Sequence, residues 1–158
     1  MLRLALRAPL LLYRVRLGWL LGERFLLLVH QGHNTGLHRE TLLEVVYRDK
    51  LTGEVVVVAA WGESAAWYRN LRAAPAIEVR IGHERWPAPN HRFLNEHELS
   101  TVLQHYQGAH PLATRALART LGWQLNAPAP ERERSLATIR AVAFSPSPWS
   151  PTPIAPIK

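Results

Sequence analysis

The spacing of hydrophobic positions changes along the chain and separates extended from helical segments. Residues 25–29 form an unbroken apolar run, which is typical of a buried strand. Two further β-like stretches, residues 40–48 and 53–60, flank turn-forming residues at 49–53, so we expect them to form a hairpin. Apolar and charged residues then alternate over residues 77–81, which indicates a half-buried strand.

Three segments in the middle of the chain have helical patterns. Residues 63–73 consist of helix formers and end before a proline. A helix is predicted over residues 95–107, because Asn95 is a favourable cap and acidic residues occupy the first turn. Another helix is predicted over residues 111–121, closed by the glycine that follows it.

The remaining segments complete the predicted fold. Residues 85–93 are expected to pair with the preceding strand, with Pro87 and Pro89 indicating an edge or an interruption. Residues 124–135 are polar and contain two prolines, so we predict a connector, followed by a last strand over residues 136–144. This order predicts an α+β fold, in which flanking helices surround a mostly antiparallel sheet small enough to close into a barrel.

The two ends of the chain differ from the middle. Residues 1–22 are predicted to form an amphipathic, leucine-rich helix with three arginines on one side, but no apolar stretch is long enough to span a membrane. Two interpretations stay open: this helix packs on its own domain, or residues 1–21 lie on an anionic membrane surface. Residues 23–144 are expected to form the main domain, and residues 145–158 a proline-rich tail.

Composition excludes several kinds of chemistry. The 158-residue chain has no cysteine, so disulfides, thiolate metal sites and cysteine nucleophiles are excluded. Asp49 is the single aspartate, which rules out sites built on paired aspartates. The eight histidines do not have the spacing of a metal-binding motif. We therefore interpret them as solvated or hydrogen-bonded surface side chains and expect no metal.

The charge balance favours anionic partners. There are 19 basic residues against 12 acidic ones, a net charge of +7 at neutral pH. Nucleic acid is not the expected partner, because no predicted helix carries a continuous basic face. Codon usage and a solvated surface are the alternative explanation for the many arginines.

The first candidate for binding chemistry is the turn at residues 32–36, Gly-His-Asn-Thr-Gly. It lacks the lysine of a phosphate-binding P-loop, and no helix follows it. It is predicted to offer free backbone N–H groups and the hydroxyls of Thr35 and Thr41, with Arg39 close behind. These groups suit an anion, and an ordinary hairpin loop is the alternative.

The second candidate covers residues 59–72. Helical spacing places Ala66 and Asn70 on one face and Trp67 with Leu71 on another. The helix is predicted to start just after a strand end, where its amides and dipole can meet a phosphate. Small residues at that strand end would let a flat ring approach the backbone, whereas a tryptophan that only fills the core is the alternative.

Together these two segments resemble the deazaflavin-dependent nitroreductase family, over roughly residues 10–123. The family pattern at the first turn, Gly-Arg-Lys-Ser-Gly and then Arg after two variable residues, is matched in part by Gly32, Thr35, Gly36 and Arg39. This resemblance implies a split β-barrel of the flavin-reductase type. The second family pattern, Trp-Tyr-x-Asn-Leu followed by a spacer and Pro, is matched by Trp67, Tyr68, Asn70, Leu71 and Pro75.

The resemblance also implies a function. It implies an oxidoreductase that binds the deazaflavin coenzyme F420, with FMN as the alternative, and passes a hydride to a quinone, nitro compound or enone. Tyr106, with His110 nearby, is the candidate proton donor in the substrate region. By position, the residues expected to meet the coenzyme phosphate are Asn34, Thr35 and Arg39, and those expected to line its ring and side chain are Ala59, Ala60, Trp61, Ala66, Trp67 and Asn70.

The chain departs from the family pattern in three places: the first turn, a shortened loop between strand and helix, and a tyrosine cluster reduced to Tyr106. The Arg-Lys pair of the family is replaced by His33 and Asn34, so two positive charges are missing, and Arg69, Arg72 or Arg85 are candidates to compensate. This loss leaves a second hypothesis open: a non-catalytic split barrel that binds FMN or an apolar, fatty-acid-like ligand at the membrane surface. By analogy with other split barrels we expect a homodimer. The expected location is cytoplasmic, with a peripheral position at the inner face of the membrane as the alternative.

Overall fold

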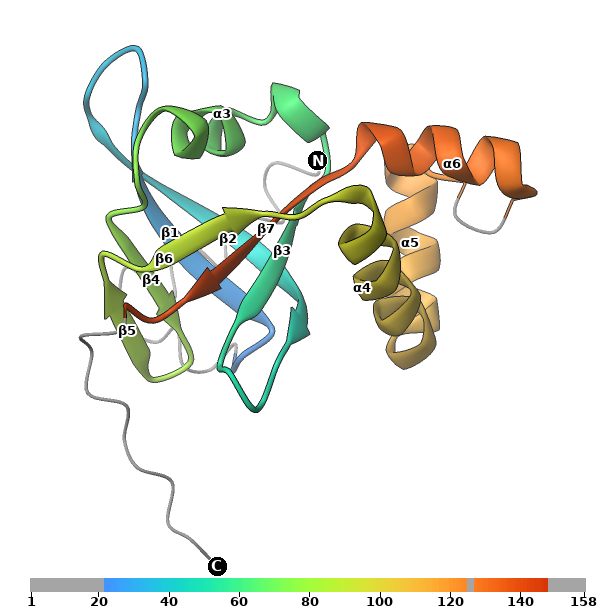
Figure 1. Ribbon diagram of the computed structural model, residues 1–158, viewed down its shortest axis with the longest axis horizontal. Coiled ribbons are helices and arrows are strands. Elements are labelled where there is room, and N and C mark those ends of the chain that lie inside the picture. Colours follow the sequence, from blue (N-terminus) through green and yellow to red (C-terminus); the bar gives the residue numbers. More distant parts are fainter. Residues whose placement is uncertain (1–21, 125–126, 148–158) are drawn as a thin grey trace, which may run out of the picture.

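The computed structural model describes residues 22–124 and 127–147 of the chain. Figure 1 shows a curled sheet, with α3 lying above it and α4, α5 and α6 gathered on one side. The strands are β1 (Phe25–Gln31), β2 (His38–Arg48), β3 (Val55–Ala59), β4 (Glu78–Ile81), β5 (Glu84–Pro87), β6 (Asn90–Phe93) and β7 (Arg140–Ser145). The helices are the short 3-10 helix η2 (Gly62–Ser64), α3 (Ala66–Ala73), α4 (Glu96–Ala109), α5 (Pro111–Leu121) and α6 (Ala129–Thr138).

The strands form one sheet in the order β5-β4-β1-β2-β3-β7-β6, and every neighbouring pair is antiparallel. The β2–β3 hairpin is present as predicted: the Asp49 carboxylate accepts hydrogen bonds from two backbone amides of the turn. The register of this pair shifts between Val45 and Tyr47, an irregularity of the kind that bends a strand and helps a sheet to curl. The predicted α+β class and split-barrel architecture are confirmed.

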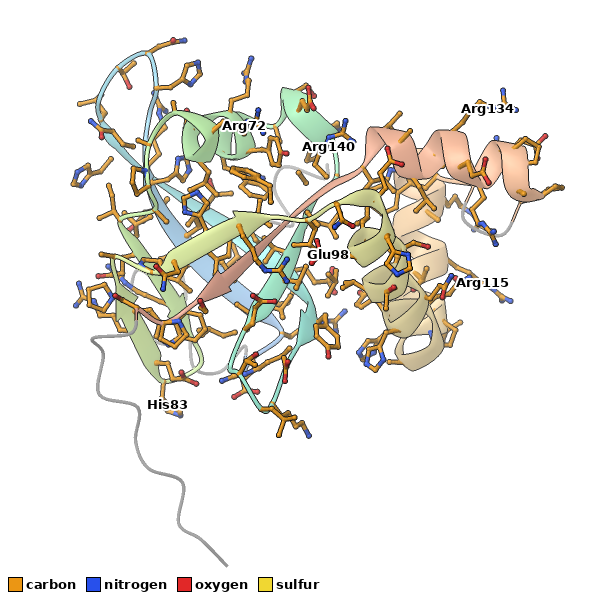
Figure 2. The ribbon with its side chains drawn as sticks, viewed as in Figure 1. Arg72, His83, Glu98, Arg115, Arg134 and Arg140 are labelled. Atoms are coloured by element: carbon orange, nitrogen blue, oxygen red, sulfur yellow. The ribbon has the colours of Figure 1, made fainter. Side chains whose placement is uncertain are left out.

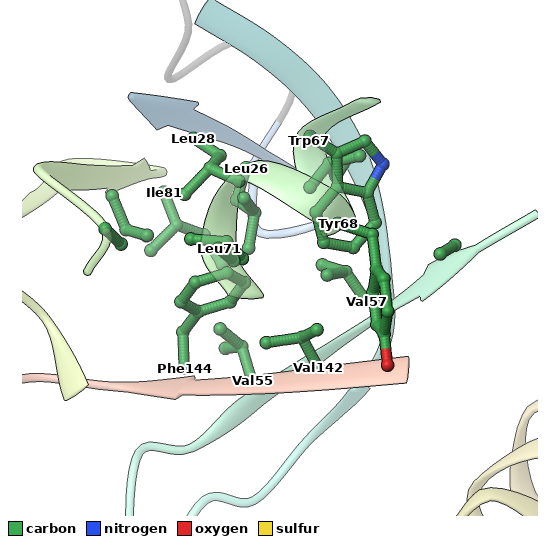
Figure 3. Packing of buried hydrophobic residues seen from close by; sticks show 14 of the residues in the cluster. Leu26, Leu28, Val55, Val57, Trp67, Tyr68, Leu71, Ile81, Val142 and Phe144 are labelled. Carbon is green, nitrogen blue, oxygen red and sulfur yellow. The ribbon is translucent and has the colours of Figure 1, made fainter. Parts of the chain in front are cut away.

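Hydrophobic side chains pack on both faces of the central strands. On the concave face, the first core cluster joins Leu26 and Leu28 of β1 to Trp67, Tyr68 and Leu71 of α3 (Figure 3). The second cluster lies beneath α4, α5 and α6. Because β3 contributes alternate valines to both clusters, its unbroken apolar sequence is explained. The second cluster includes Val56, Leu99, Leu103, Tyr106, Trp123 and Ile139.

Two predictions about the C-terminal half are wrong. Residues 129–138 form α6 rather than a connector, and β7 therefore begins at Arg140, later than the predicted strand. The two prolines do not prevent this helix, because Pro128 is its N-cap and Pro130 lies in its first turn, where no intrahelical N–H bond is required.

Other boundaries agree closely with the sequence pattern. Asn95 caps α4 in a capping box with Glu98, and Gly122 closes α5 in the left-handed conformation. The predicted strand over residues 85–93 is interrupted, as expected, and Ala88 has a positive φ of 46° at the break between β5 and β6.

The predicted N-terminal helix and most of the proline-rich tail lie outside the described residues. Within the part that the structure describes, no helix has the length and apolar character needed to cross a membrane.

Candidate functional site

The turn between β1 and β2 is closed by its own backbone. The Gly32 amide donates to the Leu37 carbonyl (2.8 Å), and the amides of Thr35 and Gly36 donate to the Gly32 carbonyl (3.2 and 2.7 Å). The expectation of several free N–H groups is therefore wrong for most of this turn, since hairpin closure uses them. Side chains are left as the main groups that an anion could meet.

Two of these side chains converge over Gly32. A Cβ atom added at Gly32 would lie 2.6 Å from the Thr35 hydroxyl oxygen and 3.1 Å from Nε of Arg39. Any larger residue would push these groups away, so the absence of a side chain at this position lets a hydroxyl and a guanidinium share one small region. Both residues are exposed, as is Asn34 at the tip of the turn.

Arg39 faces α3. It pairs with His30 across the β1–β2 ladder, and directly opposed residues in antiparallel strands project to the same face of the sheet. Arg39 and the exposed α3 residues Arg69 and Arg72 form no salt bridge with an acidic side chain in the described part of the chain. The guanidinium of Arg72, labelled at α3 in Figure 2, lies over the ring of Phe93 of β6 (5.3 Å).

The third candidate for compensating charge is held by an acidic side chain. Arg85 forms a salt bridge of 2.6 Å with the buried carboxylate of Glu78, which also pairs with Arg80.

The Arg72 guanidinium is directed to Phe93 of β6, and Arg72 lies about 200° around the helix from Asn70, which bonds to the turn. The cations left to meet a ligand at the turn are therefore Arg39 and, from α3, Arg69, donors that fit a phosphate or carboxylate.

A buried polar network fixes the turn against α3. Asn70 Oδ1 accepts from the backbone amide of His33 (3.0 Å) and lies 2.6 Å from its ring Nδ1, while Asn70 Nδ2 donates to Nδ1 of His30 (2.9 Å). Nε2 of His30 is 3.0 Å from the Thr41 hydroxyl. Because His30 Nδ1 accepts a hydrogen bond, its proton is on Nε2, which donates to Thr41.

His30 is an interior residue, which corrects its interpretation as a surface side chain. It is only 2% exposed, and burial, together with the nearby guanidinium of Arg39, lowers its pKa below the ordinary value. Asn70 is 3% exposed and bonded to both histidines. The structure thus places Asn70 as the link between turn and helix.

The residues expected to line the ring fall into two environments. Ala59 and Trp67 are buried in the first core cluster, and Trp67 packs edge-on against Tyr68. Ala66 is exposed at the start of α3, and Trp61, in the segment before η2, is 61% exposed. Ala60 and Trp61 line a pocket of about 490 Å³ whose other walls are Ser64, Gly122, Trp123, Gln124, Glu131, Arg134, Ser135 and Thr138.

Tyr106 lies away from the turn. Its ring is buried in the second core cluster, and its hydroxyl donates to Oε1 of Glu44 (2.8 Å). Burial, with a further contribution from the Glu44 carboxylate, raises the pKa of Tyr106 above the ordinary value. Glu44 is on the opposite face of β2 from Thr41 and Arg39, as the alternation of a strand requires.

The described residues contain no group of three histidine, aspartate or glutamate side chains placed to hold a metal ion. His33 is the site residue whose role the sequence did not indicate, because its partner Asn70 is 37 positions away.

Comparison with solved structures shows that the fold of this chain is shared by other proteins. A solved F420-H2 dependent reductase, FDR-A, is 20% identical with a TM-score of 0.53, covering 78% of this chain and 96% of its own. A chain described as a domain-swapped dimer is also 20% identical, with a TM-score of 0.53 and coverage of 78% and 81%. An FMN-binding protein from Nostoc punctiforme, related to pyridoxamine 5′-phosphate oxidase, is 16% identical with a TM-score of 0.51 and coverage of 91% and 79%. At these identities the likeness shows the fold.

The family follows from the sequence. The profile of the F420H(2)-dependent quinone reductase family matches residues 14–116, well over half of the chain. The chain therefore belongs to this family and is an F420-dependent oxidoreductase, as the resemblance implied. No protein with a curated description is similar enough to count as a match. The end of α5, all of α6 and β7 lie beyond the matched residues.

Proposed function

We propose that this protein reduces a quinone with reduced F420, and that the β1–β2 turn holds the phosphate end of the coenzyme. The observation that carries the proposal is the convergence of Thr35 and Arg39 over Gly32, on a turn fastened to α3. When bound, the coenzyme supplies a hydride; with one proton, this reduces a quinone to its quinol.

The turn residues have distinct roles in this proposal. Arg39 donates charged hydrogen bonds to the phosphate, and the Thr35 hydroxyl and the Asn34 side chain add neutral ones. Arg69 on α3 supplies positive charge that the family pattern places in the turn itself, whereas Arg72 is directed to Phe93 of β6. Asn70 orients the turn through His33 and is a positioning residue in this account, although the resemblance placed it beside the ring.

The ring end of the coenzyme is proposed to lie by the end of β3. Ala60 lines the pocket with a small side chain, and Trp61 offers an exposed flat face, while Ala59 lies fully buried next to them. Ala66 and Trp67, at the start of α3, complete the proposed ring region. The chain's contribution is then orientation and the exclusion of water from the reacting groups.

Several finer points belong to the same proposal. Nitro compounds and activated enones are further candidate acceptors, because they also accept a hydride. The related chain described as a domain-swapped dimer supports a homodimer. We propose that residues 23–144 form the cofactor-binding domain and that the protein is located in the cytoplasm. FMN, and an apolar ligand without redox chemistry, are the alternatives that the experiment must separate.

The experiment measures oxidation of F420H2 by menadione, with Arg39→Ala as the test variant. Loss of a charged hydrogen bond costs about 1.5–3 kcal/mol, so the KM for F420H2 is expected to rise about 10-fold or more. Arg115→Ala is the matched control, because Arg115 is an exposed arginine on α5, far from the turn (Figure 2). If the wild-type protein does not oxidise F420H2, or if both variants behave alike, the proposal is wrong.

A further inference from the structure

We propose that the pocket between η2 and α6 binds the electron acceptor, and that residues of the α5–α6 connection and of α6 select a quinone ring. This inference rests on the proposed function, since it names the acceptor site of that reaction. The pocket, of about 490 Å³, is large enough for a small aromatic molecule. Gln124 and Ser135 lie beyond the residues that the family profile matches, so family membership does not assign them.

The pocket has a firmly held wall. Gly62 of η2 has a φ of 53°, and a Cβ atom there would overlap the backbone carbonyl oxygen of Thr138 at the end of α6. Arg140 bridges the same two elements: its Nε donates to Glu63 of η2 (3.1 Å), and its Nη1 donates to the carbonyl of Ala137 (2.6 Å). Figure 2 shows Arg140 beside η2 where the two elements meet. The spacing between Trp61 and α6 is therefore fixed before any ligand arrives.

The lining chemistry fits a flat ring with polar oxygens. Trp61, which is largely exposed, supplies an aromatic face, while Trp123 is buried in the second core cluster and adds little accessible surface. A ring stacked on Trp61 gains stabilisation beyond the area it buries. The Ser135 hydroxyl oxygen accepts a hydrogen bond from the backbone N–H of Gln124 (3.0 Å), which leaves the hydroxyl hydrogen available to donate. The Gln124 side chain is exposed and carries two more donors. A quinone has a flat ring and two carbonyl oxygens that accept such bonds.

The position of the pocket also suits the reaction. Ala60 and Trp61 belong both to this pocket and to the region proposed for the coenzyme ring. Hydride transfer requires the two rings to be in contact, and a shared wall at Trp61 provides that neighbourhood.

The test measures direct binding of menadione to the coenzyme-free, full-length protein by equilibrium dialysis. Menadione is a suitable probe, because the chain has no cysteine with which it could react. Gln124→Trp adds an indole to the pocket and keeps the backbone bond to Ser135. Arg132→Trp is the matched control, since Arg132 is exposed on α6 and does not line the pocket. A second variant, Trp61→Ala, removes a largely exposed side chain and so tests the same wall with little risk to folding.

We expect Gln124→Trp and Trp61→Ala each to weaken menadione binding at least about 10-fold, while Arg132→Trp leaves it within about twofold. Methylnaphthalene, which has the same ring system without carbonyl oxygens, is expected to bind more weakly than menadione. Unchanged menadione binding in both pocket variants overturns the inference, and equal binding of methylnaphthalene overturns the assignment to a quinone.

A parallel titration with F420 separates this inference from the proposed function. We expect Gln124→Trp to bind F420 as the wild-type protein does. If the added indole blocks F420 instead, the pocket belongs to the coenzyme and the inference is wrong. If neither the wild-type protein nor the variants bind F420, the proposed function is wrong. The menadione results then still decide whether this pocket binds a quinone.

Discussion

Replacing Asn70 by alanine tests the link between the turn and α3. The substitution removes two hydrogen bonds to His33 and one to His30, and it leaves a buried ring nitrogen of His30 without a donor. A net contribution of about 0.5–1.5 kcal/mol per bond gives an expected loss of roughly 2–4 kcal/mol in the free energy of unfolding. For a chain of this size, that corresponds to a decrease in Tm of about 5–12 °C.

The assay is thermal and urea unfolding of Asn70→Ala, with Asn34→Ala as the matched control. Asn34 is an exposed asparagine at the tip of the turn, so its variant should stay within about 0.5 kcal/mol of the wild type. A double-mutant cycle with His33→Ala should give a coupling of about 1 kcal/mol or more. Equal stability of the two asparagine variants, or the absence of coupling, would refute the role assigned to the network.

Three further predictions concern stability and catalysis. The pKa of His30 is lower in the folded state, so at a pH near or below about 6.5 the unfolded chain binds a proton on this histidine more readily than the folded protein does. Tm should therefore decline as pH falls through about 6.5, and His30→Gln should flatten that decline. Gly62→Ala should cost more than about 2 kcal/mol in urea unfolding, because it adds overlap to an unfavourable φ, whereas Gly53→Ala, with open space around it, should cost only about 1 kcal/mol. Tyr106→Phe should lower stability by about 1–2 kcal/mol and leave kcat for menadione unchanged; a large fall in kcat would restore Tyr106 as a proton donor.

The sequence was informative wherever a local pattern sets the structure. The cap at Asn95, the turn at Asp49 and the closing glycine of α5 are each decided within a few residues, and all three are present as predicted. The helix-forming run over residues 63–73 also predicted a helix just after a strand end, and α3 lies there, preceded by η2.

The features that the sequence did not predict depend on contacts between distant segments, or on residues that are compatible with more than one local structure. Prolines occur both in connectors and at the start of helices, so Pro128 and Pro130 did not distinguish the two. The packing of α6 beside η2 shows that they begin a helix here. His30 appeared to be one surface histidine among eight, because its partners Thr41 and Asn70 come from another strand and a helix. For the same reason the pocket between η2 and α6, formed by segments more than 50 positions apart, had no signal in the sequence.

The most direct test of the central claim is a side-by-side titration of the purified protein with oxidised F420 and with FMN, without any acceptor. The account predicts saturable binding of F420 with a Kd in the micromolar range or below, weakened about 10-fold or more by Arg39→Ala and unaffected by Arg115→Ala. Absence of saturable F420 binding, or tighter binding of FMN than of F420, would contradict it.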